Sequence, residues 1–214
     1  MGLADTQRLL ARLYTDARVR EKFFQNPAAV AAELSLPAPD LAQLAQLRPR
    51  EITRFARSLQ NKRCGNVAKL LPHTRRALGR EFTTRFLAWT ESTAPGASHH
   101  PLDDARQFAA QLLAPAVAKN ELSPWLIALL RYESAALRAA ASRRCFILRW
   151  FPWAIADLQK CARSPRLHTN LRARLGFCLW WRLAPHARLR FITFALPPLP
   201  KRPAKSIHHR KHTR

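Results

Sequence analysis

Apolar residues recur at three- and four-residue steps through most of the first 141 positions, which predicts a succession of amphipathic helices. Asn26 and Asp16 precede two of them as N-caps, and Asp16 divides the first helix into two short ones near Tyr14. The predicted helices cover residues 3–24 in two pieces, 27–34, 40–47, 50–71, 74–89, 103–113 and 124–141.

The pattern changes after residue 142. Three short, aromatic-rich segments, 143–151, 175–183 and 188–196, are bounded by prolines, glycine and polar turns, which is typical of strands. The segment 184–187 between the last two has the length of a hairpin connection. We therefore expect an α+β fold: a mainly helical body (1–141), a small antiparallel β unit (142–200) and a disordered basic tail (201–214).

Positive charge is concentrated at the C-terminal end of the chain. The net charge is +24; residues 1–133 carry 19 Lys/Arg against 12 Asp/Glu, whereas residues 134–214 carry 18 against a single acid, Asp157. The electrostatic field of so much positive charge attracts nucleic acid, an anionic membrane or an acidic protein or peptide. The same arginine enrichment also arises from a high-GC genome without any functional demand.

Candidate partner-binding residues follow from that distribution. The set combines arginines of the β unit with two residues of the last helix: Arg143, Arg144, Arg149, Arg182, Arg188, Arg190, Tyr132 and Glu133. For Glu133 the alternative is an ion pair with Arg131, Arg138 or a neighbouring helix. We expect the tryptophans of the β unit, Trp150, Trp153, Trp180 and Trp181, to pack between sheet and helices; base stacking is the alternative.

Nothing in the sequence indicates catalysis. It has no GxSxG motif and no glycine-rich phosphate loop, so we expect no enzyme activity and no cofactor. The cysteines, Cys64, Cys145, Cys161 and Cys178, are too dispersed for zinc and are expected to be buried thiols. The tail histidines, His208, His209 and His212, lack a defined ligand set, so we predict no metal site. Without a signal segment or membrane span, the expected location is cytoplasmic.

The order of apolar landmarks across residues 50–140 carries a family resemblance. These landmarks are Phe55, Leu59, Val67-(x3)-Leu71-Pro72, Thr74, Ala77-Leu78-Gly79-(x2)-Phe82, Phe86, a Pro/Gly/His loop, Asp104-Ala105-(x2)-Phe108-Ala109-(x2)-Leu112 and Leu130-Arg131-Tyr132-Glu133-(x2)-Ala136. The order resembles the small partner proteins of multinuclear iron-dependent oxidases that modify ribosomally made peptides, as in methanobactin and bufferin systems. In some members a comparable domain forms a C-terminal extension of the iron enzyme.

The resemblance implies a non-catalytic accessory protein that docks the iron oxidase and an acidic precursor peptide, with the iron ligands supplied by the oxidase. From the residues themselves, the strand edge at Arg188–Leu196 is a candidate for pairing with an extended peptide. The helical part of this family has also been described as a DNA-binding domain. A nucleic-acid-binding protein that uses the basic C-terminal surface is therefore the alternative.

Overall fold

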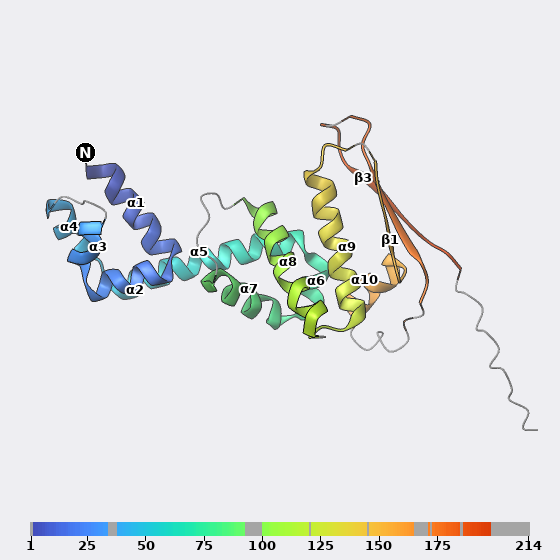
Figure 1. Ribbon diagram of the computed structural model, residues 1–214, viewed down its shortest axis with the longest axis horizontal. Coiled ribbons are helices and arrows are strands. Elements are labelled where there is room, and N and C mark those ends of the chain that lie inside the picture. Colours follow the sequence, from blue (N-terminus) through green and yellow to red (C-terminus); the bar gives the residue numbers. More distant parts are fainter. Residues whose placement is uncertain are drawn as a thin grey trace, which may run out of the picture.

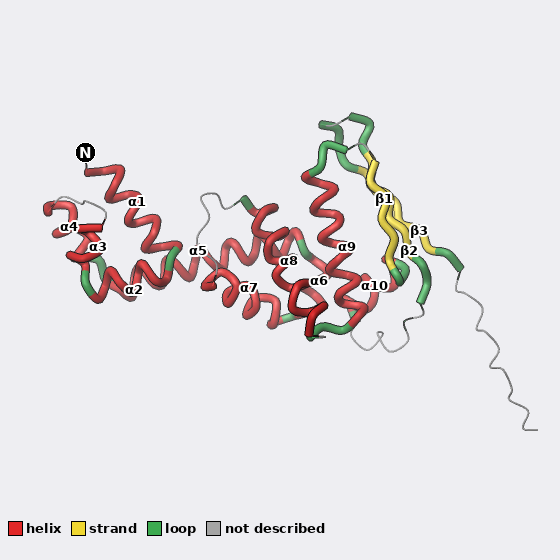
Figure 2. The backbone as a smooth tube through the Cα atoms, viewed as in Figure 1, coloured by secondary structure: helices red, strands yellow, loops and turns green. Residues whose placement is uncertain are grey.

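A computed structural model gives the architecture of the chain. It confirms an α+β fold in which helices extend from one end of an elongated molecule to a small antiparallel sheet at the other (Figures 1 and 2). The structure describes residues 2–33, 38–92, 100–119, 121–144, 146–164, 171, 173–184 and 186–197. The predicted tail, 201–214, lies outside these residues.

Four short helices form the N-terminal end: α1 (Gly2–Thr15), α2 (Ala17–Gln25), α3 (Pro27–Glu33) and α4 (Ala38–Ala45). The Asp16 carboxylate accepts the backbone N–H groups of Arg18 and Val19, which confirms the predicted break and N-cap. Helix α4 begins at Ala38, two residues before the predicted start at residue 40. These helices, together with Ile52 from the start of the next helix, enclose a core cluster around Leu9, Leu13 and Phe23.

The centre of the molecule is built from α5 (Pro49–Leu70), α6 (Pro72–Leu78), α7 (Arg80–Ser92), α8 (Pro101–Lys119) and α9 (Pro124–Ala141). A single helix over 74–89 was expected, and this prediction is wrong. The chain turns at Gly79, whose positive φ of 56° separates α6 from α7. Phe82, Phe86 and Phe108 pack edge to face in the core between α5, α7 and α8.

The C-terminal end contains β1 (Phe146–Phe151), α10 (Ile155–Arg163), β2 (Gly176–Trp181) and β3 (Arg190–Ala195). The strands pair antiparallel in the order β1-β2-β3, so β2 is central and the other two are edges. All three strands were predicted, each within a few residues of its ends. Helix α10 was missed, although Ile155, Leu158 and Cys161 recur at helical spacing and are buried.

The sheet and the last helices share one core. Tyr132 and Leu129 of α9, Leu158 of α10, and Cys178 and Trp180 of β2 belong to a single buried cluster. Side chains of α6 also pack against it. Residues on either side of the predicted 141/142 boundary therefore stabilise each other, and the sheet has α9 and α10 behind it.

Candidate docking surface on the sheet

The strand pairing determines which side chains share each face of the sheet, because cross-strand partners point the same way. Cys178 and Trp180 are buried on the face that packs against the helices. The intervening residues of β2 therefore face outward with their partners on β1 and β3. The outer face has three rows: Phe146–Trp181–Arg190, Leu148–Leu179–Ile192 and Trp150–Phe177–Phe194.

This outer face is apolar and open to solvent. Eight of its nine residues are hydrophobic, and Arg190 at a corner is the exception. Phe146 is 69% exposed, Trp150 is 67% exposed, and Leu148, Ile192 and Phe194 are about half exposed. Phe177 and Phe194 stack with centroids 5.1 Å apart. A contiguous apolar surface of this kind is typical of an interaction site.

The expected packing of the tryptophans holds only in part. Trp180 is buried and Trp153 is partly buried against the helices, but Trp150 is exposed and Trp181, although partly buried, belongs to the outer face, which corrects the prediction for these two residues. The strands carry apolar residues in both alternating phases, and this pattern also occurs in strands that are covered on both faces. The sequence signal was therefore present, and the second face is left open among the described residues.

Arginines flank the outer face. Arg143 and Arg144 are exposed between α9 and β1, Arg188 is exposed just before β3, and Arg190 lies in the outer row. Arg149 is exposed too, although it pairs with Cys178 and thus belongs to the inner phase of β1. The predicted set therefore contains five exposed guanidinium groups around the sheet.

The other three predicted residues are buried and make contacts within the protein. Arg182 donates from Nη2 to the carbonyl of Ala139 at 2.9 Å, which ties the end of β2 to the C-terminal turn of α9. Tyr132 packs against the rings of Phe151 and Trp180, and burial raises the pKa of its hydroxyl to about 12.

Glu133 caps the start of α6. Its carboxylate accepts the backbone N–H groups of His73 and Thr74, both at 2.8 Å, and the Thr74 hydroxyl at 2.5 Å. Burial raises the pKa of Glu133, and these three hydrogen bonds oppose that shift. The carboxylate joins two helices through a cap, an arrangement that was not among the expectations from the sequence.

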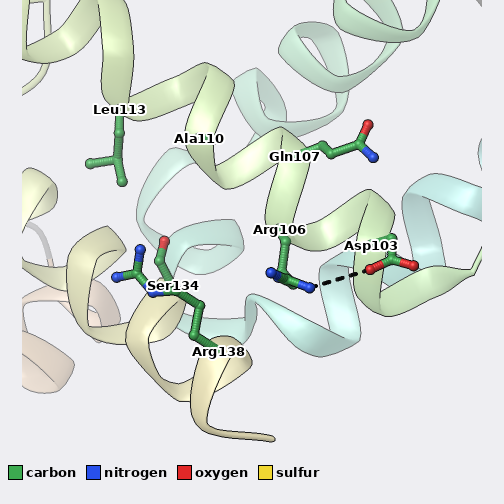
Figure 3. Close-up of a pocket in the computed structure, with 7 residues that line it drawn as sticks. All are labelled: Asp103, Arg106, Gln107, Ala110, Leu113, Ser134 and Arg138. Atoms are coloured by element: carbon green, nitrogen blue, oxygen red, sulfur yellow. Dashed lines mark hydrogen bonds and ion pairs between the residues drawn. The ribbon is translucent and has the colours of Figure 1, made fainter. Parts of the chain in front are cut away.

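Two cavities lie beside α9. One, of about 300 Å³, lies between the end of α9 and β1 and is lined by Ala135, Arg138, Ala139, Ser142, Arg144 and residues 146–149. The other, of about 410 Å³, lies between α8 and α9 (Figure 3). Its lining consists of Asp103, Arg106, Gln107, Ala110, Leu113, Ser134 and Arg138.

The remaining groups with chemical reactivity are the cysteines and the possible metal ligands. Cys64, Cys161 and Cys178 are buried free thiols, as predicted, and burial raises the pKa of each. Cys145 and the tail histidines fall outside the described residues. In the part of the chain that is described, no three His, Cys, Asp or Glu side chains are placed to share a metal ion. No described helix has the length and apolar character needed to cross a membrane.

Fold and surface together define a helical protein with an exposed, arginine-flanked sheet face. Residues 39–114 match the family model described as SCO6045-like, C-terminal domain. The match covers α4 to the middle of α8 and ends before the sheet. No similar protein is found among curated proteins.

Proposed function

We propose that this protein is a non-catalytic accessory protein that docks a multinuclear iron oxidase and its acidic precursor peptide. The observation that carries the proposal is the outer face of the sheet, with eight hydrophobic side chains in three aligned rows. Leaving that surface in water is unfavourable, and a folded partner removes it from water on binding. Phe146 and Trp150 are suitable anchors, because aromatic side chains are enriched among the residues that dominate binding energies.

The charge around this face selects the kind of partner. Arg190, Arg188, Arg143 and Arg144 favour a surface with an apolar centre and an acidic rim. A second copy of the same chain is disfavoured, because each copy carries a net charge of +24. The family resemblance of residues 50–140 supports an iron oxidase as this partner. The protein itself then supplies affinity and orientation, and the chemistry belongs to the oxidase.

The test is binding to an iron oxidase encoded beside this chain. We expect the wild type to co-purify with it, and the double variant Trp150→Ser/Phe194→Ser to bind at least about a hundredfold more weakly in calorimetry. Phe55→Ser is the matched control, because Phe55 is a half-exposed aromatic residue on α5, far from the sheet. Wild-type protein that does not bind the oxidase would contradict the proposal.

A second candidate is binding of single-stranded nucleic acid. Exposed Phe146 and Trp150, on the face that carries Arg190 at its far corner, provide ring faces and positive charge, the combination that holds unpaired bases. This candidate predicts retarded mobility of single-stranded DNA or RNA at about 50 mM salt and a steep loss of binding as salt rises. Unchanged mobility at that salt concentration excludes it.

A further inference from the structure

The cavity between α8 and α9 is lined by charges of both signs. Arg106 and Arg138 contribute two guanidinium groups and Asp103 contributes one carboxylate, so two positive groups stand against one negative group. Figure 3 shows Arg106 turned toward Asp103, the Ser134 hydroxyl between the two guanidinium groups in this view, and Gln107 pointing away from them. The polar contacts that a ligand finds in the cavity therefore come from four side chains on two helices.

The lining residues of α8 order these groups along the cavity. Asp103, Arg106, Ala110 and Leu113 follow one another at three- and four-residue steps, so they form a row along one side of the helix. The row begins with the charged pair and ends, about 15 Å further along the helix axis, with apolar side chains. This order suits a ligand that has a charged head group and an aliphatic stem.

The charged pair at the start of the row leaves both of its partners open to a ligand. Arg106 Nη1 lies 3.5 Å from Asp103 Oδ1, longer than the roughly 2.7–2.9 Å of a charge-assisted hydrogen bond, and the two side chains are 44% and 54% exposed. Such a pair adds little to stability, so a ligand can replace it at low cost. A head group with a carboxylate next to an ammonium satisfies both partners, and this is the head group of an α-amino acid.

The α9 side of the cavity provides a second position for an anion. Arg138 is exposed, and no carboxylate of the described residues lies within ion-pair distance of it. Next to it, the Ser134 hydroxyl donates to the Leu130 carbonyl at 2.7 Å, so its oxygen remains able to accept a hydrogen bond from a ligand. A guanidinium without a counter-charge favours a carboxylate, which it can hold through two parallel hydrogen bonds.

We propose that the cavity between α8 and α9 binds a free acidic amino acid, represented by L-glutamate. Its α-carboxylate and ammonium pair with Arg106 and Asp103, and its side-chain carboxylate pairs with Arg138. Its methylene stem lies against Ala110 and Leu113. The ligand carries about one net negative charge at pH 7, which balances the excess positive charge of the lining. The cavity volume of about 410 Å³ is typical of small-molecule sites.

This inference goes beyond the docking of an oxidase and does not depend on it. The four polar residues of the cavity lie on α8 and α9, and none of them belongs to the outer face of the sheet. Loss of amino-acid binding therefore leaves the docking proposal unchanged, and loss of oxidase binding leaves the amino-acid site unchanged.

Calorimetric titration of the full-length chain with L-glutamate at pH 7 tests the proposal. We expect a Kd of about 1 mM or tighter, and roughly tenfold weaker binding of glutarate, which has both carboxylates but no ammonium. Arg106→Gln and Arg138→Gln are each expected to weaken glutamate binding about tenfold or more. Arg131→Gln is the matched control, because Arg131 is exposed on α9 outside the cavity; we expect a change of less than about twofold.

Asp103→Asn tests the ammonium position separately. The substitution keeps the size of the side chain and removes its charge. We expect glutamate to bind more weakly to this variant and glutarate to bind more tightly, because Arg106 loses its internal counter-charge. The preference of the wild type for glutamate over glutarate is thus expected to disappear. An unchanged preference would contradict the assignment of Asp103.

Amide chemical shifts in NMR locate the ligand. Glutamate is expected to shift the amides of residues 103–113 and 134–138, which carry the lining side chains. Shifts confined to other parts of the chain would overturn the inference. It is also overturned by absence of binding up to about 20 mM glutamate, by equal affinity for glutarate, or by displacement with an equal concentration of inorganic phosphate. Equal weakening by Arg131→Gln and Arg138→Gln would reduce the effect to net charge and would overturn it as well.

Discussion

Glu133→Ala is expected to lower the free energy of unfolding by about 3 kcal/mol. The substitution leaves the backbone N–H groups of His73 and Thr74 and the Thr74 hydroxyl without their acceptor in a buried setting. It also removes the link between α9 and the first turn of α6. Urea denaturation measures the effect as a lower midpoint with an unchanged slope.

Glu51→Ala is the control for this change, because Glu51 is exposed and its pair with Arg48 is in solvent; we expect a change within about 0.5 kcal/mol. Equal stability of Glu133→Ala and Glu51→Ala would show that the cap contributes nothing. The two variants remove the same carboxylate charge, so a difference between them reports the buried cap and not net charge.

The same carboxyl group gives a pH dependence of known sign. Burial raises the pKa of Glu133 above its ordinary value of 4.5, so the folded protein holds this proton more tightly than the unfolded chain. The free energy of unfolding therefore falls as pH rises from about 4.5, and levels off once the folded carboxyl has ionised. Glu133→Gln cannot titrate at this position. The free energy of unfolding of the wild type minus that of Glu133→Gln is therefore expected to fall as pH rises above about 4.5. A difference that does not change with pH would contradict the raised pKa.

Gly176→Ala is expected to destabilise the sheet by about 3 kcal/mol. A Cβ on Gly176 would lie 2.4 Å from the carbonyl oxygen of Trp153 and 3.0 Å from the Cα of Ala154. Both are backbone atoms of the turn that leads into α10, so neither can rotate aside. To fit the methyl group, β2 must move away from this turn, which disturbs the core shared by β2, α9 and α10.

Gly65→Ala is the matched control and is expected to have the opposite sign. A Cβ on Gly65 meets nothing within 4 Å, and the residue lies inside α5, where alanine is favoured over glycine by about 0.5–1 kcal/mol. Thermal denaturation of the two variants checks both signs. A Gly176→Ala protein as stable as the wild type would mean that β2 does not approach the 152–154 turn closely.

Local signals account for the elements that were predicted well. Helix α9 spans 124–141, as expected, because Pro124 marks its start and apolar residues recur along its whole length. The Asp16 and Asn26 caps were predicted because a short polar side chain before an apolar run satisfies the first free N–H groups of a helix. The break at Gly79 was missed, since the apolar periodicity continues across it from Leu78 to Phe82.

The candidate site was predicted less completely. Exposed Arg143, Arg144, Arg149, Arg188 and Arg190 surround the sheet, but Tyr132, Glu133 and Arg182 have internal contacts. Glu133 could not be assigned to α6 from the sequence, because the residues it binds lie 59 and 60 positions away. Arg138 was considered only as a possible partner of Glu133, and its place between two cavities depends on α8 and β1.

The sequence by itself determined most of the secondary structure, the α+β class and the concentration of positive charge after residue 133, because these depend on neighbouring residues and composition. The tertiary structure alone decided which apolar residues of the strands are buried. Hydrophobic residues occur in both phases of the strands. The packing of α9 and α10 buries Phe151, Cys178 and Trp180 on one face, whereas the other face, and Phe191 at the β3 edge of the inner face, stay exposed. That surface, and the two cavities beside α9, arise from contacts between segments far apart in the chain.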